Sequence, residues 1–343
     1  MLLFENLWLI WLESAPWLIL GLLIAGVMKA LIPSQWMEQQ LGGGSRYSVI
    51  KAAFIGAPLP LCSCGVVPAA LGIRRAGASK SVTVSFLVAT PETGPDSITL
   101  SYALLGPFMA IIRPIAAISS AVVAGLLVRH EAAEQALDNS SSEKVTCCAV
   151  KAKANETKWQ QAQSGLSYSF GKLLADISGW LIIGMLVAAI IQTYVPSDWF
   201  AQWGSGVSAM LVMAVVGIPM YICASASTPI AAGFLAAGLS PGAVLVFMLA
   251  GPATNIGTLG IIKKELGRAP LVAYLVGVIV TALAFGYATD LLAGWIQTNA
   301  PSWQAWLPQV ITNDSHQHAM GDNWHQVLLS VGLILLMIRA KLK

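Results

Sequence analysis

The sequence predicts an all-α, polytopic membrane protein. It contains two inverted repeats of three spans plus one re-entrant or broken helical segment each, followed by one extra C-terminal span. Three features support this prediction: an apolar composition, two proline-rich apolar stretches and an internal repeat. Hydrophobic residues make up 56% of the 343 residues and charged residues 10%, whereas about 25% of an ordinary soluble domain is charged. This composition excludes a soluble enzyme, a disordered chain and a nucleic-acid-binding protein, and it predicts the lipid bilayer as a partner.

Apolar runs of the length that a bilayer requires follow one another along the chain. They lie near 15–33, 81–104, 107–128, 173–195, 239–262, 270–292 and 324–339. Residues 1–16 contain no basic cluster, so they predict a short interfacial helix with Trp8 and Trp11 at the membrane surface rather than a cleavable signal. The runs predict seven spans.

Two other apolar stretches, 48–72 and 208–236, are too rich in proline to be regular spans. The first contains Pro58, Pro60 and Pro68, and the second contains Pro219 and Pro229. Proline removes backbone donors, and irregular backbone at membrane depth is tolerated only where protein buries it or where it lines a cavity. Both stretches are therefore predicted to be re-entrant or broken elements that contribute to a site.

The two proline-rich stretches belong to an internal repeat. At an offset of 161 residues, Gly56–Ser97 and Gly217–Thr258 are identical at 13 of 42 positions. The matches include Gly56 with Gly217, Pro58 with Pro219, Cys62 with Cys223, Pro68 with Pro229 and Pro91 with Pro252. Apolar composition alone does not place matches on prolines, glycines and a cysteine, and internal duplication is typical of transporters.

The basic residues indicate how the repeats are oriented. If both proline-rich stretches return to the side on which they start, 18 of the 19 basic residues fall on one side, and Arg113 lies inside a span. The positive-inside rule makes that side cytoplasmic. The N-terminus is then periplasmic and the C-terminus cytoplasmic in the cell inner membrane, and three spans in each repeat make the repeats inverted. Full crossing would instead move Arg74, Arg75, Lys80 and the 130–165 loop outside.

The same distribution divides the chain into five units. They are a first transmembrane repeat at 1–129, a polar cytoplasmic linker at 130–170, a second transmembrane repeat at 171–293, a periplasmic loop at 294–323 and a C-terminal transmembrane helix at 324–343.

Cysteines in the proline-rich stretches predict a binding site for a soft ion. Cys62 and Cys64 stand two residues apart in a chain that prolines keep from forming a regular helix, so both thiols are able to face one ligand. Thiolates select soft ions such as Cu(I), and also zinc, and trivalent arsenic is comparably thiophilic. Cys223 occupies the position equivalent to Cys62, and Ser225 replaces Cys64. An inverted repeat would bring the three thiols together, although membrane cysteines also serve simply as small packing residues.

Carboxylates interrupt one of the apolar runs. Glu92 and Asp96 are four residues apart within it, and intramembrane carboxylates usually mark an ion or proton path. We therefore expect Glu92, Asp96 and Arg113 to couple transport to protons. Asn255 offers a neutral polar group in the second repeat, close to where the first repeat has these carboxylates, and is expected near the ion. The alternative is that the carboxylates only pair with Arg113.

The polar segments contain further candidate metal ligands. Cys147 and Cys148 form a vicinal pair in the cytoplasmic linker, and His316 and His318 lie in the periplasmic loop, with His325 shortly after it. Imidazoles accept zinc or copper, and thiols inside with imidazoles outside would favour export. Such groups also occur in solvated loops without any function.

No catalytic or cofactor motif accompanies these residues. The chain has no phosphate-binding loop, no HExxH and no nucleophile triad, so neither an enzyme nor a permanently bound cofactor is expected, and the ligand is the transported ion. Two rivals remain: an importer of a sulfur-containing small molecule, and a membrane thiol oxidoreductase that uses Cys62 and Cys64. The sequence does not indicate an oligomeric state.

The motifs resemble those of the ArsP-type family of predicted permeases. The resemblance rests on Pro58–Pro68 with its Cys-Ser-Cys-Gly, on Gly72–Ser79, on Phe86–Gly94 and on Gly251–Asn255, and it covers roughly 15–128 and 173–292. Members are described as efflux permeases for trivalent organoarsenicals, and a two-cysteine branch is described as copper/zinc efflux. The resemblance implies that Cys62, Cys64 and Cys223 handle the ion. The vicinal cysteines and the histidine-bearing loop resemble the two-cysteine branch more closely.

Overall fold

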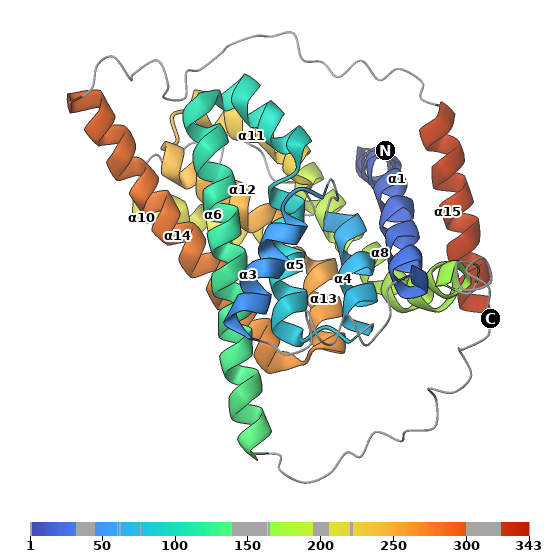
Figure 1. Cartoon of the computed structure of the whole chain (residues 1–343). Coiled ribbons are helices and arrows are strands. Elements are labelled where there is room, and N and C mark those ends of the chain that lie inside the picture. The colour runs from blue at the N-terminus through green and yellow to red at the C-terminus, as the bar shows by residue number, and fades with distance from the viewer. Residues whose placement is uncertain are drawn as a thin grey trace.

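In the described part of the chain, every regular element is a helix (Figure 1). The computed structural model describes residues 2–31, 45–59, 61, 63–75, 77–138, 163, 165–194, 206–219, 222–299 and 324–342. The helices are α1 (Leu2–Leu31), α3 (Arg46–Gly56), α4 (Ser63–Arg75), α5 (Lys80–Glu92), α6 (Pro95–Asp138), α8 (Leu174–Tyr194), α10 (Val207–Gly217), α11 (Ala224–Ala236), α12 (Pro241–Ala253), α13 (Ile256–Glu265), α14 (Arg268–Asn299) and α15 (Trp324–Leu342).

Two long helices, α6 and α14, pack side by side (Figure 1). By length and composition, Pro95–Arg129 and Arg268–Asn299 are each able to cross a bilayer. Two bent helix pairs raise the number of candidate spans among the described residues to four, if each pair counts as one span. The sequence predicted seven. The difference arises because several predicted runs form shorter apolar helices, or helices interrupted by a break.

The predicted spans 81–104 and 239–262 are each broken in the middle. α5 ends at Glu92 rather than continuing to residue 104, and α6 begins at Pro95. α12 ends at Ala253, and α13 continues at an angle of 51° to it. Each break follows a proline near the helix end, Pro91 or Pro252. Apolar composition marked these runs as single spans, but the helix ends depend on the local Pro and Gly chemistry.

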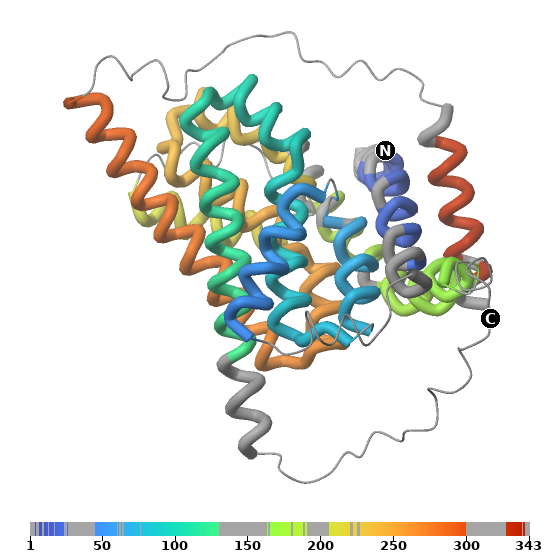
Figure 2. The backbone as a smooth tube through the Cα atoms, viewed as in Figure 1, coloured from blue at the N-terminus to red at the C-terminus, as the bar shows by residue number. Residues whose placement is uncertain are grey.

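The proline-rich stretches are broken helices, as predicted, and the first returns to the end at which it starts. Ser85 donates to the carbonyl of Val49, and Thr93 donates to the carbonyl of Ala57. Both bonds join residues 36 positions apart, so α3 and α5 run in the same direction. α4 connects them and must therefore run back, as Figure 2 traces, with α5 lying between α3 and α4. At 11 and 13 residues, α3 and α4 are roughly 16 and 20 Å long, too short to cross a core of about 30 Å alone.

The turn after each broken segment has the same backbone structure in both repeats. Ala78 N–H donates to the Ile73 carbonyl, and Leu239 N–H donates to the Phe234 carbonyl. The residue before each donor is a glycine with positive φ, Gly77 at 113° and Gly238 at 91°. This is a glycine-dependent helix ending, because the left-handed conformation carries no steric cost without a Cβ atom.

The helix that follows each turn is capped by a serine, which explains why these residues recur. Ser79 Oγ accepts from Val82 N–H and Ser240 Oγ accepts from Ala243 N–H. Such caps satisfy one of the backbone donors that a helix start leaves unpaired. α5 and α12 then run through the centre of the molecule, and every residue at 81–92 and 242–253 is buried.

A second pair of equivalent glycines bends the chain beyond the breaks. Gly106 has φ 82° inside α6, and Gly267 has φ 106° between α13 and α14. The two positions are 161 residues apart, which is the offset of the sequence repeat.

The N-terminal segment differs from its prediction. Residues 1–16 were expected to form a separate interfacial helix, but α1 runs without a break from Leu2 to Leu31 and contains Pro16. α1 packs against α8 and α15, and the indole of Trp11 donates to the carbonyl of Ser330 at 3.3 Å. Tertiary packing thus holds the first and last helices of the chain together (Figure 1).

Candidate functional site

The candidate site lies where the helices break. Among the described residues, eight buried side-chain nitrogen and oxygen atoms have no hydrogen-bond partner. Five of the eight belong to four residues: Ser63 at the start of α4, Glu92 at the end of α5, Arg113 of α6 and Asn255 between α12 and α13. Buried polar atoms are normally paired, and an unpaired group is costly. Four of these five atoms lie at helix breaks and the fifth belongs to Arg113 within α6, and such a set of unpaired polar atoms indicates a functional site.

Glu92 is the last residue of α5 and is fully buried. Its exposed fraction is 0%, and neither carboxylate oxygen has a hydrogen-bond partner. The carboxylate lies within electrostatic range of the Arg113 guanidinium and of the Tyr274 hydroxyl. The neighbouring threonine hydroxyls are turned to the backbone, since Thr90 donates to Phe86 and Thr93 donates to Ala57 and Ala89.

Arg113 is fully buried and joins the first repeat to the second. Its guanidinium donates to Ser101 Oγ at 2.7 Å and, at 3.4 Å, to the carbonyl of Ser97. It also donates across to α11, to Thr228 Oγ1 at 3.1 Å and to the carbonyl of Ala224 at 3.1 Å. All of these acceptors are uncharged, and the Arg113 Nε atom remains unpaired.

The alternative in which Glu92 and Asp96 simply pair with Arg113 is wrong for this arrangement. Ion pairs within 4.0 Å occur among the described residues, but none joins Arg113 to either carboxylate. Asp96 lies exposed in the first turn of α6, four residues and one helix break away from the buried Glu92. The Pro and Gly residues at 91, 94 and 95 place the two carboxylates in different environments.

Cys223 immediately precedes α11 and is half-buried. It lies within electrostatic range of Arg113, whose guanidinium bonds the carbonyl of the next residue, Ala224. Of the other predicted thiols, Cys62, Cys147 and Cys148 lie outside the described residues. Cys64 lies in α4, and its side chain is also outside the described part, as is that of Ser225 in α11.

Asn255 has a structural role that the sequence did not predict. Its side-chain oxygen accepts from Thr258 N–H at 2.7 Å and caps α13, while its Nδ2 atom has no partner. The nearby Tyr274, fully buried in α14, donates its hydroxyl to the carbonyl of Ala253 at the end of α12. Asn255 therefore offers a donor to this break and leaves little acceptor capacity for a cation.

The histidine cluster cannot be placed. His316 and His318 lie outside the described residues, and His325 is in α15 with its side chain undescribed. Within the described ranges, no group of three or more His, Cys, Asp or Glu side chains is arranged to hold a metal ion.

An ion network that the sequence did not predict lies at the other end of α4. Arg75 pairs with Asp176 at 3.0 Å and with Glu265 at 2.7 Å, and it donates to Tyr168 Oη at 2.6 Å. It ties the end of α4 to α8 through Asp176 and to the end of α13 through Glu265. Partial burial lowers the pKa of Arg75, but the bonds to Tyr168, Asp176 and Glu265 raise it by more, so the guanidinium remains charged. Contacts of this kind depend on residues roughly 90 to 190 positions apart, and no sequence pattern signals them.

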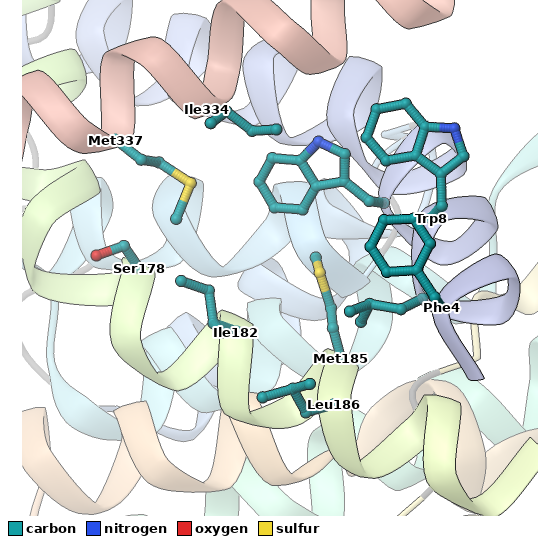
Figure 3. A pocket seen from close by; sticks show the side chains of 10 residues that line it. Phe4, Trp8, Ser178, Ile182, Met185, Leu186, Ile334 and Met337 are labelled. Carbon is teal, nitrogen blue, oxygen red and sulfur yellow. The ribbon is translucent and has the colours of Figure 1, made fainter. Parts of the chain in front are cut away.

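An apolar groove lies elsewhere, between α1, α8 and α15 (Figure 3). It has a volume of about 450 Å³ and an almost wholly apolar lining that includes Trp8, Met185 and Met337. Its polar residue, Ser178, donates to the carbonyl of Ala175 in its own helix. No predicted site residue whose side chain the structure describes lines this groove, so the groove is separate from Glu92, Arg113 and Cys223.

Comparisons with known proteins point to one function class. Residues 3–291 match the model of a family described as a predicted permease. A Streptococcus mutans protein whose name describes a two-component membrane permease complex subunit is 24% identical over 257 residues, which are 74% of this chain and 83% of that protein. A UPF0718 protein of Methanocaldococcus jannaschii is 24% identical over 332 residues, with 80% and 91% of the two chains covered. The UPF0718 protein YraQ of Escherichia coli is 24% identical over 251 residues, with 72% and 68% covered. No solved structure matches the chain.

Proposed function

The chain belongs to the ArsP-type predicted permease family, and on that premise we propose that it exports a soft metal or metalloid ion through a thiol-bearing site between the two broken hairpins. Family membership and the apolar helices make it a multi-pass membrane protein, and they favour a transporter over an enzyme. The proposed substrate class comprises Cu(I), Zn(II) and trivalent arsenicals, because these ions bind thiolates well.

The observation that carries this proposal is the position of Cys223. The residue is half-buried at the start of α11 and lies near the fully buried guanidinium of Arg113. A helix N-terminus and an adjacent cation both favour the thiolate over the thiol, and the thiolate is the form that binds a soft ion. A cysteine that only fills space needs neither neighbour.

The remaining ligands in the proposal come from the first hairpin. Cys62 and Cys64 lie in sequence where α3 gives way to α4, at the positions equivalent to Cys223 and Ser225. If the repeats are inverted, the two breaks face each other and three thiols surround one ion. The distribution of basic residues supports a periplasmic N-terminus and a cytoplasmic C-terminus.

Accessory residues complete the proposed export path. Cys147 and Cys148 would deliver the ion on the cytoplasmic side, and His316, His318 and His325 would accept it on the periplasmic side. Replacing the three histidines is expected to weaken metal tolerance. Unchanged export in that triple variant would remove the histidines from the path without affecting the thiol site.

The proposal is tested by growth and by cellular metal content. A strain that overproduces the chain is expected to tolerate copper, zinc or arsenite better than the vector strain and to contain less of that element. Cys62→Ser and Cys223→Ser should each return tolerance to the vector level. Ser227→Ala, a change at a buried hydroxyl that bonds only its own helix, serves as the control and should retain tolerance.

Three outcomes would contradict metal export or favour one of the alternative functions. Unchanged tolerance to copper, zinc and arsenite would refute the metal-export proposal. A higher cellular content of the element, or uptake of a sulfur compound that depends on Cys223, would indicate import. Reversible oxidation of Cys62 and Cys64 in alkylation mapping would favour the thiol oxidoreductase.

A further inference from the structure

We propose that Glu92 is the proton-binding site of this permease and that Arg113 transmits its protonation state to α11, so that protons and the transported ion move in opposite directions. This inference rests on the proposed export function for its direction, but the protonation switch itself involves no metal. It assigns a coupling ion, the proton, and one pair of residues to the coupling step.

The surroundings of Glu92 suit the protonated carboxyl group. Neither oxygen has a hydrogen-bond partner, and the exposed fraction is 0%. An isolated carboxylate in an apolar site is strongly unfavourable, whereas the neutral acid is tolerated.

The partner for the ionised state is Arg113. Glu92 and Arg113 are the ionisable side chains, apart from the Tyr274 phenol, that the described part of the chain buries completely. They are linked through one residue, because Ser97 Oγ donates to the Glu92 carbonyl and the Ser97 carbonyl accepts from Arg113. The unpaired Nε atom leaves the guanidinium with a donor to offer.

Other titratable groups face this pair from the neighbouring elements. Asp96 of α6 and Cys223 before α11 lie within electrostatic range of Arg113, and Tyr274 of α14 lies within range of Glu92. α12 contributes no titratable side chain. Of the titratable groups on the other helices packed on α5, Arg46 and Tyr47 of α3 and Arg74 and Arg75 of α4 lie toward its opposite end, as does Lys80 of α5 itself. Lys51 of α3 lies beside the middle of α5, and Cys64 lies in the first turn of α4, with its side chain outside the described residues.

Loss of the proton would exchange the partners of Arg113. When the carboxyl group releases its proton, the buried carboxylate needs a cation, and pairing with Arg113 supplies one. In the proposed switch the guanidinium moves toward Glu92 on α5 and gives up its two acceptors on α11, Ala224 O and Thr228 Oγ1. The first turn of α11, which directly follows Cys223, is released. Rebinding a proton at Glu92 restores both bonds, so each proton cycle moves the thiol site once.

The test follows the accessibility of Cys223 as the pH changes, in the full natural chain in detergent and without metal. Alkylation of the Cys223 peptide is quantified by mass spectrometry and divided by its rate in the denatured chain at the same pH, which corrects for the pH dependence of an unperturbed thiol. The Glu92→Gln chain, measured in the same way, supplies the pH dependence that Cys223 has in the folded state without the switch. In the parent chain this ratio should rise with pH by roughly tenfold or more, a change that one hydrogen bond to a charged group can support. In Glu92→Gln it should stay at the low, acid-state value at every pH.

Matched variants separate the switch from general damage. Asp96→Asn removes an exposed charge within electrostatic range of Arg113, so it should at most shift the profile along the pH axis without removing the rise. Thr228→Val removes an Arg113 acceptor and should move the rise to lower pH, whereas Ser227→Ala should not. A Glu92→Gln chain that keeps the parent profile, or a profile flattened by Asp96→Asn instead, overturns the proposal. Failure of metal export would leave this result unaffected, so the two proposals fail separately.

Discussion

The contact between α12 and α14 gives the sharpest test of the packing that positions the site. A Cβ atom added at Gly242 would lie 2.1 Å from the carbonyl oxygen of Gly286 and 2.7 Å from Cγ of Asp290. The nearest obstacle is backbone and cannot rotate away. Gly242→Ala must therefore push the two helices apart by more than about 1 Å to reach ordinary van der Waals separation.

This separation also breaks a cap. Asp290 accepts from the Gly242 N–H at 2.6 Å and from Ser240 Oγ at 2.8 Å, and both bonds lengthen when the helices move apart. Overpacking costs about 1–3 kcal/mol, and a lost hydrogen bond to a charged group costs about 1.5–3 kcal/mol. The combined loss is expected near 3 kcal/mol, or roughly 5–10 °C in Tm.

The assay is thermal unfolding in detergent, followed by tryptophan fluorescence at one fixed scan rate. Gly294→Ala is the matched control, because it lies in α14 like Gly286 and an added Cβ atom there meets nothing within 4 Å. Its Tm should be unchanged or higher, since alanine favours a helix over glycine by about 1 kcal/mol. If Gly242→Ala unfolds within about 2 °C of the parent, or if Gly294→Ala loses as much as Gly242→Ala, the close-packing argument is refuted.

Two further predictions concern polar contacts. Arg75→Gln breaks the ion pairs to Asp176 and Glu265, whose side chains are 31% and 21% exposed, so we expect a loss of about 1 kcal/mol that shrinks in 1 M salt. The measurement is the Tm of the parent and of Arg75→Gln at low and at high salt. If the Tm of both chains depends equally on salt, the ion network does not contribute to stability. Tyr274→Phe leaves the Ala253 carbonyl without its side-chain donor, so the free energy of unfolding should fall by about 1–3 kcal/mol. A denaturant titration measures this, and a change within 0.5 kcal/mol, on the order of experimental error, would count against a structural role for the hydroxyl.

The buried pair, Glu92 and Arg113, illustrates how the fold gives intramembrane charges different environments. Arg113 donates to four neutral acceptors, whereas neither carboxylate oxygen of Glu92 has a hydrogen-bond partner. A buried ion pair of good geometry is stable and therefore static, whereas separated partners leave one group ready to change state. The arrangement thus favours a role in coupling over one in stability.

The sequence by itself determined the features that follow from overall composition or from single residues. Membrane class follows from the sparse charges, and the two broken hairpins follow from proline, because both are local consequences of single residues. The repeat, read at an offset of 161, correctly paired Gly77 with Gly238 and Ser79 with Ser240, since each pair fixes its own turn or cap. The prediction that Glu92 and Arg113 belong to one site also came from the sequence, on the cost of burying charge.

Only the tertiary structure decided where the helices end and what the polar groups contact. Apolar composition cannot distinguish one span from two helices broken at Thr93 or Thr254, because hydropathy averages over the break. The partners of Arg113 on α11 lie 111 and 115 residues away in the sequence, so no local pattern encodes them. The sequence identified the charged residues, and the packing of two repeats decided that Glu92 is left without a partner while Arg113 holds the helix that follows Cys223.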